Sequence, residues 1–149
     1  MASDKPEELI DPLADVLGYQ LRRASLATMT VLNERFEEIG LRPTEAIILR
    51  FVSANPGCNQ SAIGRALGVK RTNMVPIVAG LEARGLLNRT PADGRSNALT
   101  LTEAGWELFA KVRAAADEVE AQFYGWVPDD LRDTVLGLCR EVRRRADEA

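Results

Sequence analysis

Apolar residues recur at helical spacing from the first part of the chain. Asp11 suits a helix N-cap and Pro12 the first helical position, and apolar side chains then follow at three- and four-residue intervals as far as Val31. The pattern predicts a long first helix over about 12–38, with Gly40 as its stop. A small domain does not need so long a helix in its interior, so we expect this helix to begin an interface.

The middle of the chain changes from short helices to a hairpin and then returns to long helices. Asn59 and Thr102 are good N-caps, and Asp93-Gly94 is a strong turn signal between two short apolar runs. The predicted order is therefore long helix, three shorter helices, β-hairpin and two long helices. The remaining elements are expected over about 43–54, 60–67, 71–84, 86–90, 98–101, 103–124 and 128–146.

This order predicts a mainly α fold with a small β-hairpin wing. A short helix, a tight glycine-containing connection and a second helix form a helix-turn-helix, and a hairpin directly after it forms a wing. We expect one domain over 1–149, with a winged helix-turn-helix lobe over 42–101. The helices over 9–40 and 102–147 are expected to form a dimerisation region.

Charge is distributed unevenly along the chain. The whole sequence has a net charge of −3, but residues 59–97 hold six basic and two acidic residues. The rest holds 13 basic and 20 acidic residues. A basic segment on an acidic body suits a protein that touches DNA through one module, although chance unevenness would give the same count.

Composition argues against several other classes. The chain has no histidine, only two cysteines (Cys58 and Cys139) and no nucleotide-binding or nucleophile-elbow motif. An enzyme would lack the usual general base, and neither a metal site nor a cofactor is expected. No apolar run approaches a membrane span and no secretory pattern opens the sequence, so a cytoplasmic protein without a membrane partner is expected.

Four short motifs together resemble the MarR (multiple antibiotic resistance regulator) family. They are LGVKRTN at the entry to the predicted recognition helix, LEARGLLNR at its exit, DGRS at the wing tip and LTLTEAG at the start of the next helix. The flanking helices also follow the family's order. The resemblance implies a homodimeric regulator, usually a repressor, that binds a pseudo-palindromic site in double-stranded DNA.

The residues expected at DNA lie on two helices and the wing. At the recognition helix we expect Asn73 to read adenine, Arg71 guanine and Thr72 phosphate. The resemblance places Arg95 in a minor groove, where Asp93 either orients it or only sets the turn. Asn59 is expected mainly as a cap. The full set of DNA-binding candidates is Asn59, Gln60, Ser61, Lys70, Arg71, Thr72, Asn73, Arg89, Asp93 and Arg95.

The resemblance also implies a small-molecule effector, often a phenol or an aromatic carboxylate. Tyr19, Arg23, Leu26 and Thr30 share one side of the first helix and would offer one cation, two hydroxyls and an apolar wall. An ordinary, partly packed helix face has the same spacing. The alternative function is a winged-helix protein-interaction module without DNA binding, which would present an apolar recognition surface.

One feature departs from a regular recognition helix. Pro76 and Gly80 both lie inside the segment expected to enter the major groove. Proline removes a backbone hydrogen bond and tends to kink a helix, and an interior glycine costs about 1 kcal/mol relative to alanine. A bend after Val75 would still leave the first turn of the helix available to the bases.

Overall fold

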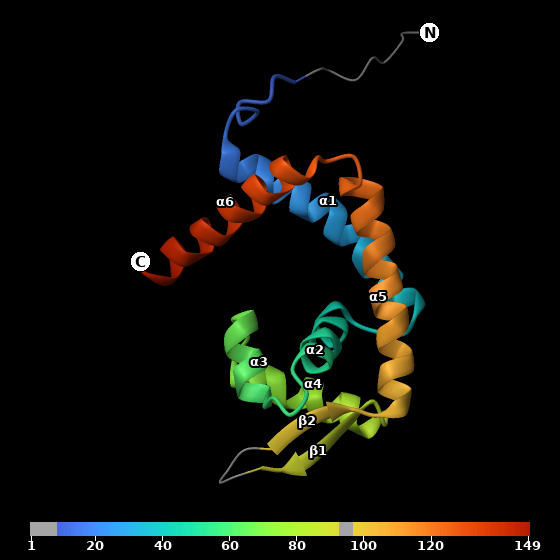
Figure 1. Ribbon diagram of the computed structural model, residues 1–149. Coiled ribbons are helices and arrows are strands. Elements are labelled where there is room, and N and C mark those ends of the chain that lie inside the picture. Colours follow the sequence, from blue (N-terminus) through green and yellow to red (C-terminus); the bar gives the residue numbers. More distant parts are fainter. Residues whose placement is uncertain (1–8, 93–96) are drawn as a thin grey trace, which may run out of the picture.

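The computed structural model describes residues 9–92 and 97–149. These residues form six helices and one two-stranded antiparallel sheet, in the order that the sequence pattern predicts (Figure 1). The elements are α1 (Leu17–Glu38), α2 (Pro43–Ala54), α3 (Gln60–Leu67), α4 (Arg71–Ala83), β1 (Leu87–Pro91), β2 (Asn97–Leu101), α5 (Glu103–Tyr124) and α6 (Asp129–Asp147).

The first helix begins later than the sequence predicts. Asp11 does accept a hydrogen bond from the backbone N–H of Leu13, at 2.9 Å, but it closes a separate turn over 12–15. Val16 then takes extended backbone angles (φ −88°, ψ 104°), which separate this turn from the helix. The prediction of a helix from residue 12 is therefore wrong, and α1 starts at Leu17.

The two predicted caps, at the starts of α3 and α5, are confirmed. The Asn59 side chain accepts a hydrogen bond from the N–H of Ala62 at 2.8 Å, and Thr102 Oγ1 accepts one from the N–H of Gly105 at 2.9 Å. Thr102 also donates its hydroxyl proton to the Gly85 carbonyl at 2.6 Å. This residue therefore fixes the start of α5 to the loop that precedes the hairpin.

The lobe encloses one apolar core. Helices α2, α3 and α4 and both strands contribute side chains to it, and α1 and α5 close it from the other side. Among its most deeply buried residues are Phe36, Ile48, Leu49, Ile63, Met74, Leu81, Leu99 and Val112. The lobe therefore depends on α1 and α5 to complete its core.

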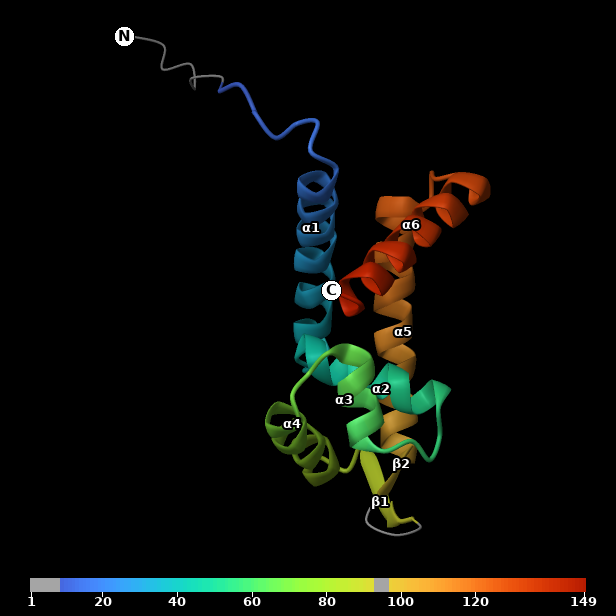
Figure 2. The same ribbon diagram turned by 90° about the vertical axis from the view of Figure 1, so that its left-hand side faces the viewer.

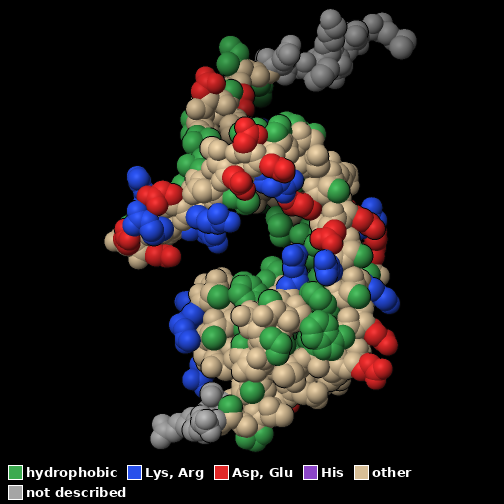
Figure 3. All heavy atoms as spheres, in the orientation of Figure 1, with side chains coloured by type: hydrophobic (Ala, Val, Ile, Leu, Met, Phe, Trp, Pro, Cys, Tyr) green, Lys and Arg blue, Asp and Glu red, His purple; other side chains and the backbone are tan. Residues whose placement is uncertain are grey.

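Helix α5 connects the lobe to the other long helices. It packs along α1 and α2, while α6 turns back from its far end (Figures 1 and 2). Arg132 holds that corner, because it donates to Glu120 Oε1 at 2.7 Å and to the Tyr124 carbonyl at 3.1 Å. No described residue of α6 is buried, and the molecule is open between α6 and the lobe (Figure 3).

Within residues 9–92 and 97–149, no helix has both the length and the apolar character needed to cross a bilayer.

Candidate nucleic-acid interface

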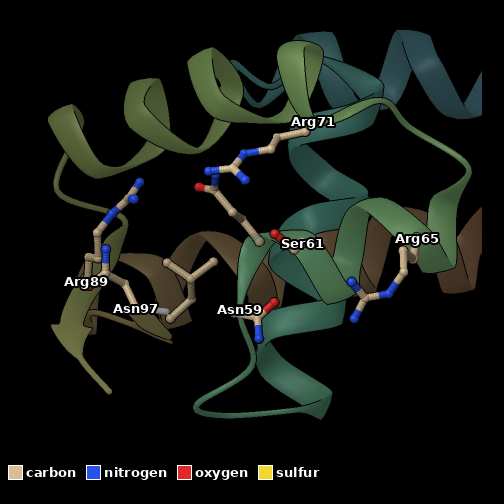
Figure 4. A pocket seen from close by; sticks show the side chains of 8 residues that line it. Asn59, Ser61, Arg65, Arg71, Arg89 and Asn97 are labelled. Carbon is tan, nitrogen blue, oxygen red and sulfur yellow. The ribbon is translucent and has the colours of Figure 1, made fainter. Parts of the chain in front are cut away.

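A hollow of about 400 Å³ lies between the helix-turn-helix and the wing (Figure 4). We call it the basic hollow. Three arginines reach it from three elements: Arg65 from α3, Arg71 from the start of α4 and Arg89 from β1. Its lining residues are Asn59, Gln60, Ser61, Arg65, Arg71, Arg89, Asn97 and Leu99. Cations from separate elements thus converge on one concave surface.

A short backbone link places α3 beside the wing. Cys58 pairs with Leu99 as an isolated antiparallel bridge, and the Leu99 N–H donates to the Cys58 carbonyl at 2.8 Å. Asn59 follows directly and caps α3, so the first turn of that helix opens onto the hollow. Burial raises the pKa of the Cys58 thiol, and a backbone hydrogen bond opposes this only in part.

The first turn of α3 brings polar groups to the hollow. Gln60 and Ser61 belong to this turn, where backbone N–H groups and the helix dipole favour an anion such as phosphate. The Gln60 Oε1 atom is buried and has no hydrogen-bond partner among the described residues. Asn59, Gln60 and Ser61 therefore lie together as a group, with Asn59 committed to capping.

Charge in the hollow is only partly compensated from within the chain. Arg89 donates through Nε to Glu82 Oε2 at 3.1 Å, so one of the three guanidiniums has an acidic partner. Arg71 projects from α4 over the hollow (Figure 4). The surface as a whole favours a polyanion.

The connection between α3 and α4 is tight. A Cβ on Gly64 would lie 3.0 Å from the Val69 carbonyl oxygen and 3.2 Å from Met74 Cγ, so only glycine leaves the two helices this close without a shift. Gly68 ends α3 with a positive φ of +65°, in the left-handed region that favours glycine. The helix-turn-helix expected from the sequence is confirmed.

Helix α4 presents its first turn to solvent. Lys70 is its N-cap residue, and Arg71, Thr72 and Asn73 are exposed. The helix is continuous through Pro76 to Ala83, and Gly80 has open space where a Cβ would be. The Pro76 ring lies on the exposed side, where it does not displace the core.

The wing is the hairpin predicted between the two apolar runs. β1 and β2 pair from Leu87–Leu101 to Pro91–Asn97. Asp93 and Arg95, the predicted wing-tip residues, lie outside the described residues. Asn97 and Arg65 line the basic hollow but were absent from the predicted site. Arg65 belongs to the basic segment and Asn97 ends it, which is the signal that marks them.

The four candidate effector residues lie together on one side of α1. The Arg23 guanidinium lies 5.8 Å from the centre of the Tyr19 ring and 3.9 Å from an Asp11 carboxylate oxygen. The Thr30 hydroxyl donates to the Leu26 carbonyl at 2.9 Å, and Leu26 is exposed. None of the four lines the basic hollow. Their role in binding an effector stays a prediction.

Two further polar features of α1 were not anticipated. The Tyr124 hydroxyl of α5 donates to Thr28 Oγ1 at 3.2 Å, which joins the two long helices. Asn33 Oδ1, one turn after Thr30, is buried and has no hydrogen-bond partner among the described residues. Spacing alone did not mark Asn33, because its burial depends on packing between helices.

Comparisons with known proteins agree with this geometry. The sequence profile of the MarR family matches residues 39–96. A Thauera aromatica protein assigned to transcriptional regulation of the hcr operon is 30% identical, over 98% of this chain and 90% of its own length.

Solved structures give the same picture over most of the chain. The transcriptional repressor CouR, bound to a 23-mer DNA duplex, superposes with a TM-score of 0.80 at 33% identity and covers 92% of this chain and 99% of its own. CouR from Rhodococcus jostii RHA1, bound to p-coumaroyl-CoA, gives a TM-score of 0.77 at 27% identity, over 91% of this chain and 94% of its own. With the winged lobe, the long flanking helices and a full-length relative in agreement, the chain belongs to the MarR family of transcriptional regulators.

Proposed function

We propose that the chain is a dimeric, sequence-specific DNA-binding repressor that a small aromatic ligand releases from DNA. The observation that carries the proposal is the convergence of Arg65, Arg71 and Arg89 on the basic hollow between the recognition helix and the wing. Its electrostatics suit the phosphate backbone, and the structurally similar CouR is described bound to a DNA duplex. We place the protein in the cytoplasm, where a bacterial-type regulator meets the chromosome.

In this proposal each element has a separate task at the duplex. The first turn of α4 enters the major groove, where Arg71 and Asn73 reach base edges. Phosphate lies at the first turn of α3, against Gln60, Ser61 and the side chain of Arg65. Arg89, on β1 of the wing, contacts the phosphate backbone of the same DNA strand from the other side of the hollow. We thus divide the chain as expected, with the DNA-binding lobe over 42–101.

The dimer would form through the regions 9–40 and 102–147. Helix α6 exposes an apolar stripe at intervals of four, three and four residues, made of Leu131, Val135, Leu138 and Val142. A chain of this size would not leave such a stripe in water without a partner. Hydrophobic side chains also gather around the opening beside α6 (Figure 3). A second copy that covers this surface would hold two lobes for a pseudo-palindromic site.

The proposed effector is an aromatic acid or its coenzyme A thioester. CouR binds p-coumaroyl-CoA, which combines a phenol with an anionic carrier. On α1, the Tyr19 ring and Leu26 offer an apolar surface and Arg23 a cation, and the Asn33 Oδ1 atom lacks a partner among the described residues. A ligand wedged between α1 and the lobe would change the spacing of the two lobes.

The test is binding to a duplex recovered by selection on the purified protein, followed by fluorescence anisotropy. Arg71→Ala should weaken binding by roughly 1–3 kcal/mol per lobe. A plot of the logarithm of the affinity against the logarithm of the salt concentration should have a slope of about −0.9 for each phosphate contact. Arg113→Ala is the matched control, because Arg113 is an exposed arginine on α5 that pairs with Asp117 away from the hollow.

The outcome separates the proposal from its rival. A protein-interaction module would select no duplex, or would bind DNA with an affinity that salt does not change. Equal impairment of Arg71→Ala and Arg113→Ala would also contradict the assigned surface.

A further inference from the structure

The outer side of α4 carries an exposed row of uncharged, mainly apolar residues. Thr72, Val75, Pro76 and Ala79 lie on the side of the helix opposite Met74, Val78 and Leu81, which pack into the core. All four are exposed, and Val75 keeps 43% of its surface open to solvent. We call these four residues the outer row. Its composition is unusual for the solvent side of a helix, which is normally polar.

The outer row does not help the helix to fold. A proline in a helix interior costs about 3 kcal/mol relative to alanine. Pro76 has no N–H to donate to the Thr72 carbonyl four residues earlier. Because Pro76 and Val75 are exposed, neither repays this cost through core packing. A local rule broken at the surface, with no gain in packing, points to a role in binding.

The outer row is continuous with the proposed DNA interface. It starts between Arg71, which lines the basic hollow, and Asn73 in the same first turn. No residue of the row is charged, and the acidic residue beside its far end, Glu82, is paired with Arg89. Cations around an uncharged, apolar strip fit a major groove, which has phosphates along both edges and base edges in between.

We infer that the outer row reads thymine by contact with its C5-methyl group. In the major groove this methyl is the one apolar group among the base-edge features, and small apolar side chains recognise it. Val75 and Pro76 supply methyl and methylene surfaces, and Ala79 is small enough for close approach. The operator half-site should therefore carry thymines opposite the second turn of α4. The inference rests on the proposed DNA-binding function and specifies the sequence class.

Replacing thymine by deoxyuridine in the selected duplex tests the inference directly. An A·U pair keeps every base-pairing hydrogen bond and loses only the methyl group. We expect the wild-type dimer to bind a duplex with one such replacement per half-site about three- to fivefold more weakly per lobe, on the scale of one buried methylene group. Replacements outside the half-site should have no effect.

Two variants show whether the outer row is responsible. Val75→Ala removes two methyl groups, so it should reduce the difference between thymine and uracil at one position and keep it at the others. Pro76→Ala restores a backbone N–H, so it should raise the thermal stability of the protein while it lowers discrimination at its own position. If Pro76 does not contact the base, the variant should gain the same stability with discrimination unchanged.

The outcomes are distinguishable from those of the proposed function. Wild-type protein that binds thymine and uracil duplexes equally would overturn thymine reading and leave DNA binding intact. Protein that selects no duplex would overturn both thymine reading and DNA binding. Binding of a purified protein partner through the outer row would then account for the exposure of that row.

Discussion

Among single residues, Gly105 of α5 and Gly80 of α4 differ in whether the fold leaves room for a side chain. A Cβ on Gly105 would overlap the carbonyl oxygen of Leu86 and would lie 3.3 Å from Leu101 Cβ, where backbone and core leave no room. A Cβ on Gly80 would meet nothing within 4 Å. Gly105 is therefore required for packing α5 onto the base of the wing, whereas Gly80 is not required by the fold.

The two alanine variants should shift stability in opposite directions. Gly105→Ala should lower the free energy of unfolding by about 1–3 kcal/mol, because the added methyl forces α5 away from Leu86. Gly80→Ala should raise it by up to about 1 kcal/mol through helix propensity. Urea unfolding followed by circular dichroism measures both. Similar stability for the two variants would contradict the close packing at Gly105.

Among the secondary-structure elements, the sequence predicted correctly those features that depend on hydrogen bonds between residues close in the chain. The caps Asn59 and Thr102 are correct because each side chain bonds the backbone three residues ahead. Asp11 led to a wrong start for the first helix, because its hydrogen bond with the N–H of Leu13 forms equally well in an isolated turn. The basic hollow could not be predicted in full, because it depends on the Cys58–Leu99 pairing between segments far apart in sequence.

The end of α6 carries an ion-pair group that can be tested by titration. Glu141 accepts from Arg144 and Arg145, at 2.7 Å to each through Oε1, and these hydrogen bonds lower its pKa from 4.5 to about 2. The lowered pKa means that the pairing is present above the ordinary pKa of the carboxyl and is lost as pH falls towards 2.

NMR titration of the Glu141 carboxyl carbon should thus give a midpoint near 2. In an Arg144→Ala, Arg145→Ala double variant the midpoint should return towards 4.5. A Glu141 midpoint that the double variant leaves unchanged would show that these arginines do not hold the carboxylate in solution.

At the scale of the whole molecule, an acidic protein can still bind DNA because its charge is segregated. The net charge is −3, yet three cations of the lobe, Arg65, Arg71 and Arg89, face one hollow, and the acidic excess lies outside residues 59–97. The acidic remainder of the chain repels the duplex, so the protein binds DNA only when the basic hollow faces it. Two lobes fixed by one interface would then reach two half-sites together, which ties DNA affinity to dimerisation.

This dependence yields a final prediction for Leu138→Glu. Leu138 belongs to the exposed stripe of α6, so the variant should keep its helical content while a charge in the apolar interface separates the protomers. Sedimentation should show a monomer, and operator affinity should fall by about 10²–10⁴-fold, because two linked lobes gain that much from effective concentration.

Gly137→Glu is the control, since it adds the same charge one position away, outside the stripe, where a Cβ meets nothing within 4 Å. It should remain dimeric and bind DNA like the wild type. If Leu138→Glu stays dimeric, the stripe is not the interface. If Leu138→Glu becomes monomeric but binds the operator as tightly as the wild type, a single lobe is sufficient, and the pseudo-palindromic arrangement is not what determines affinity.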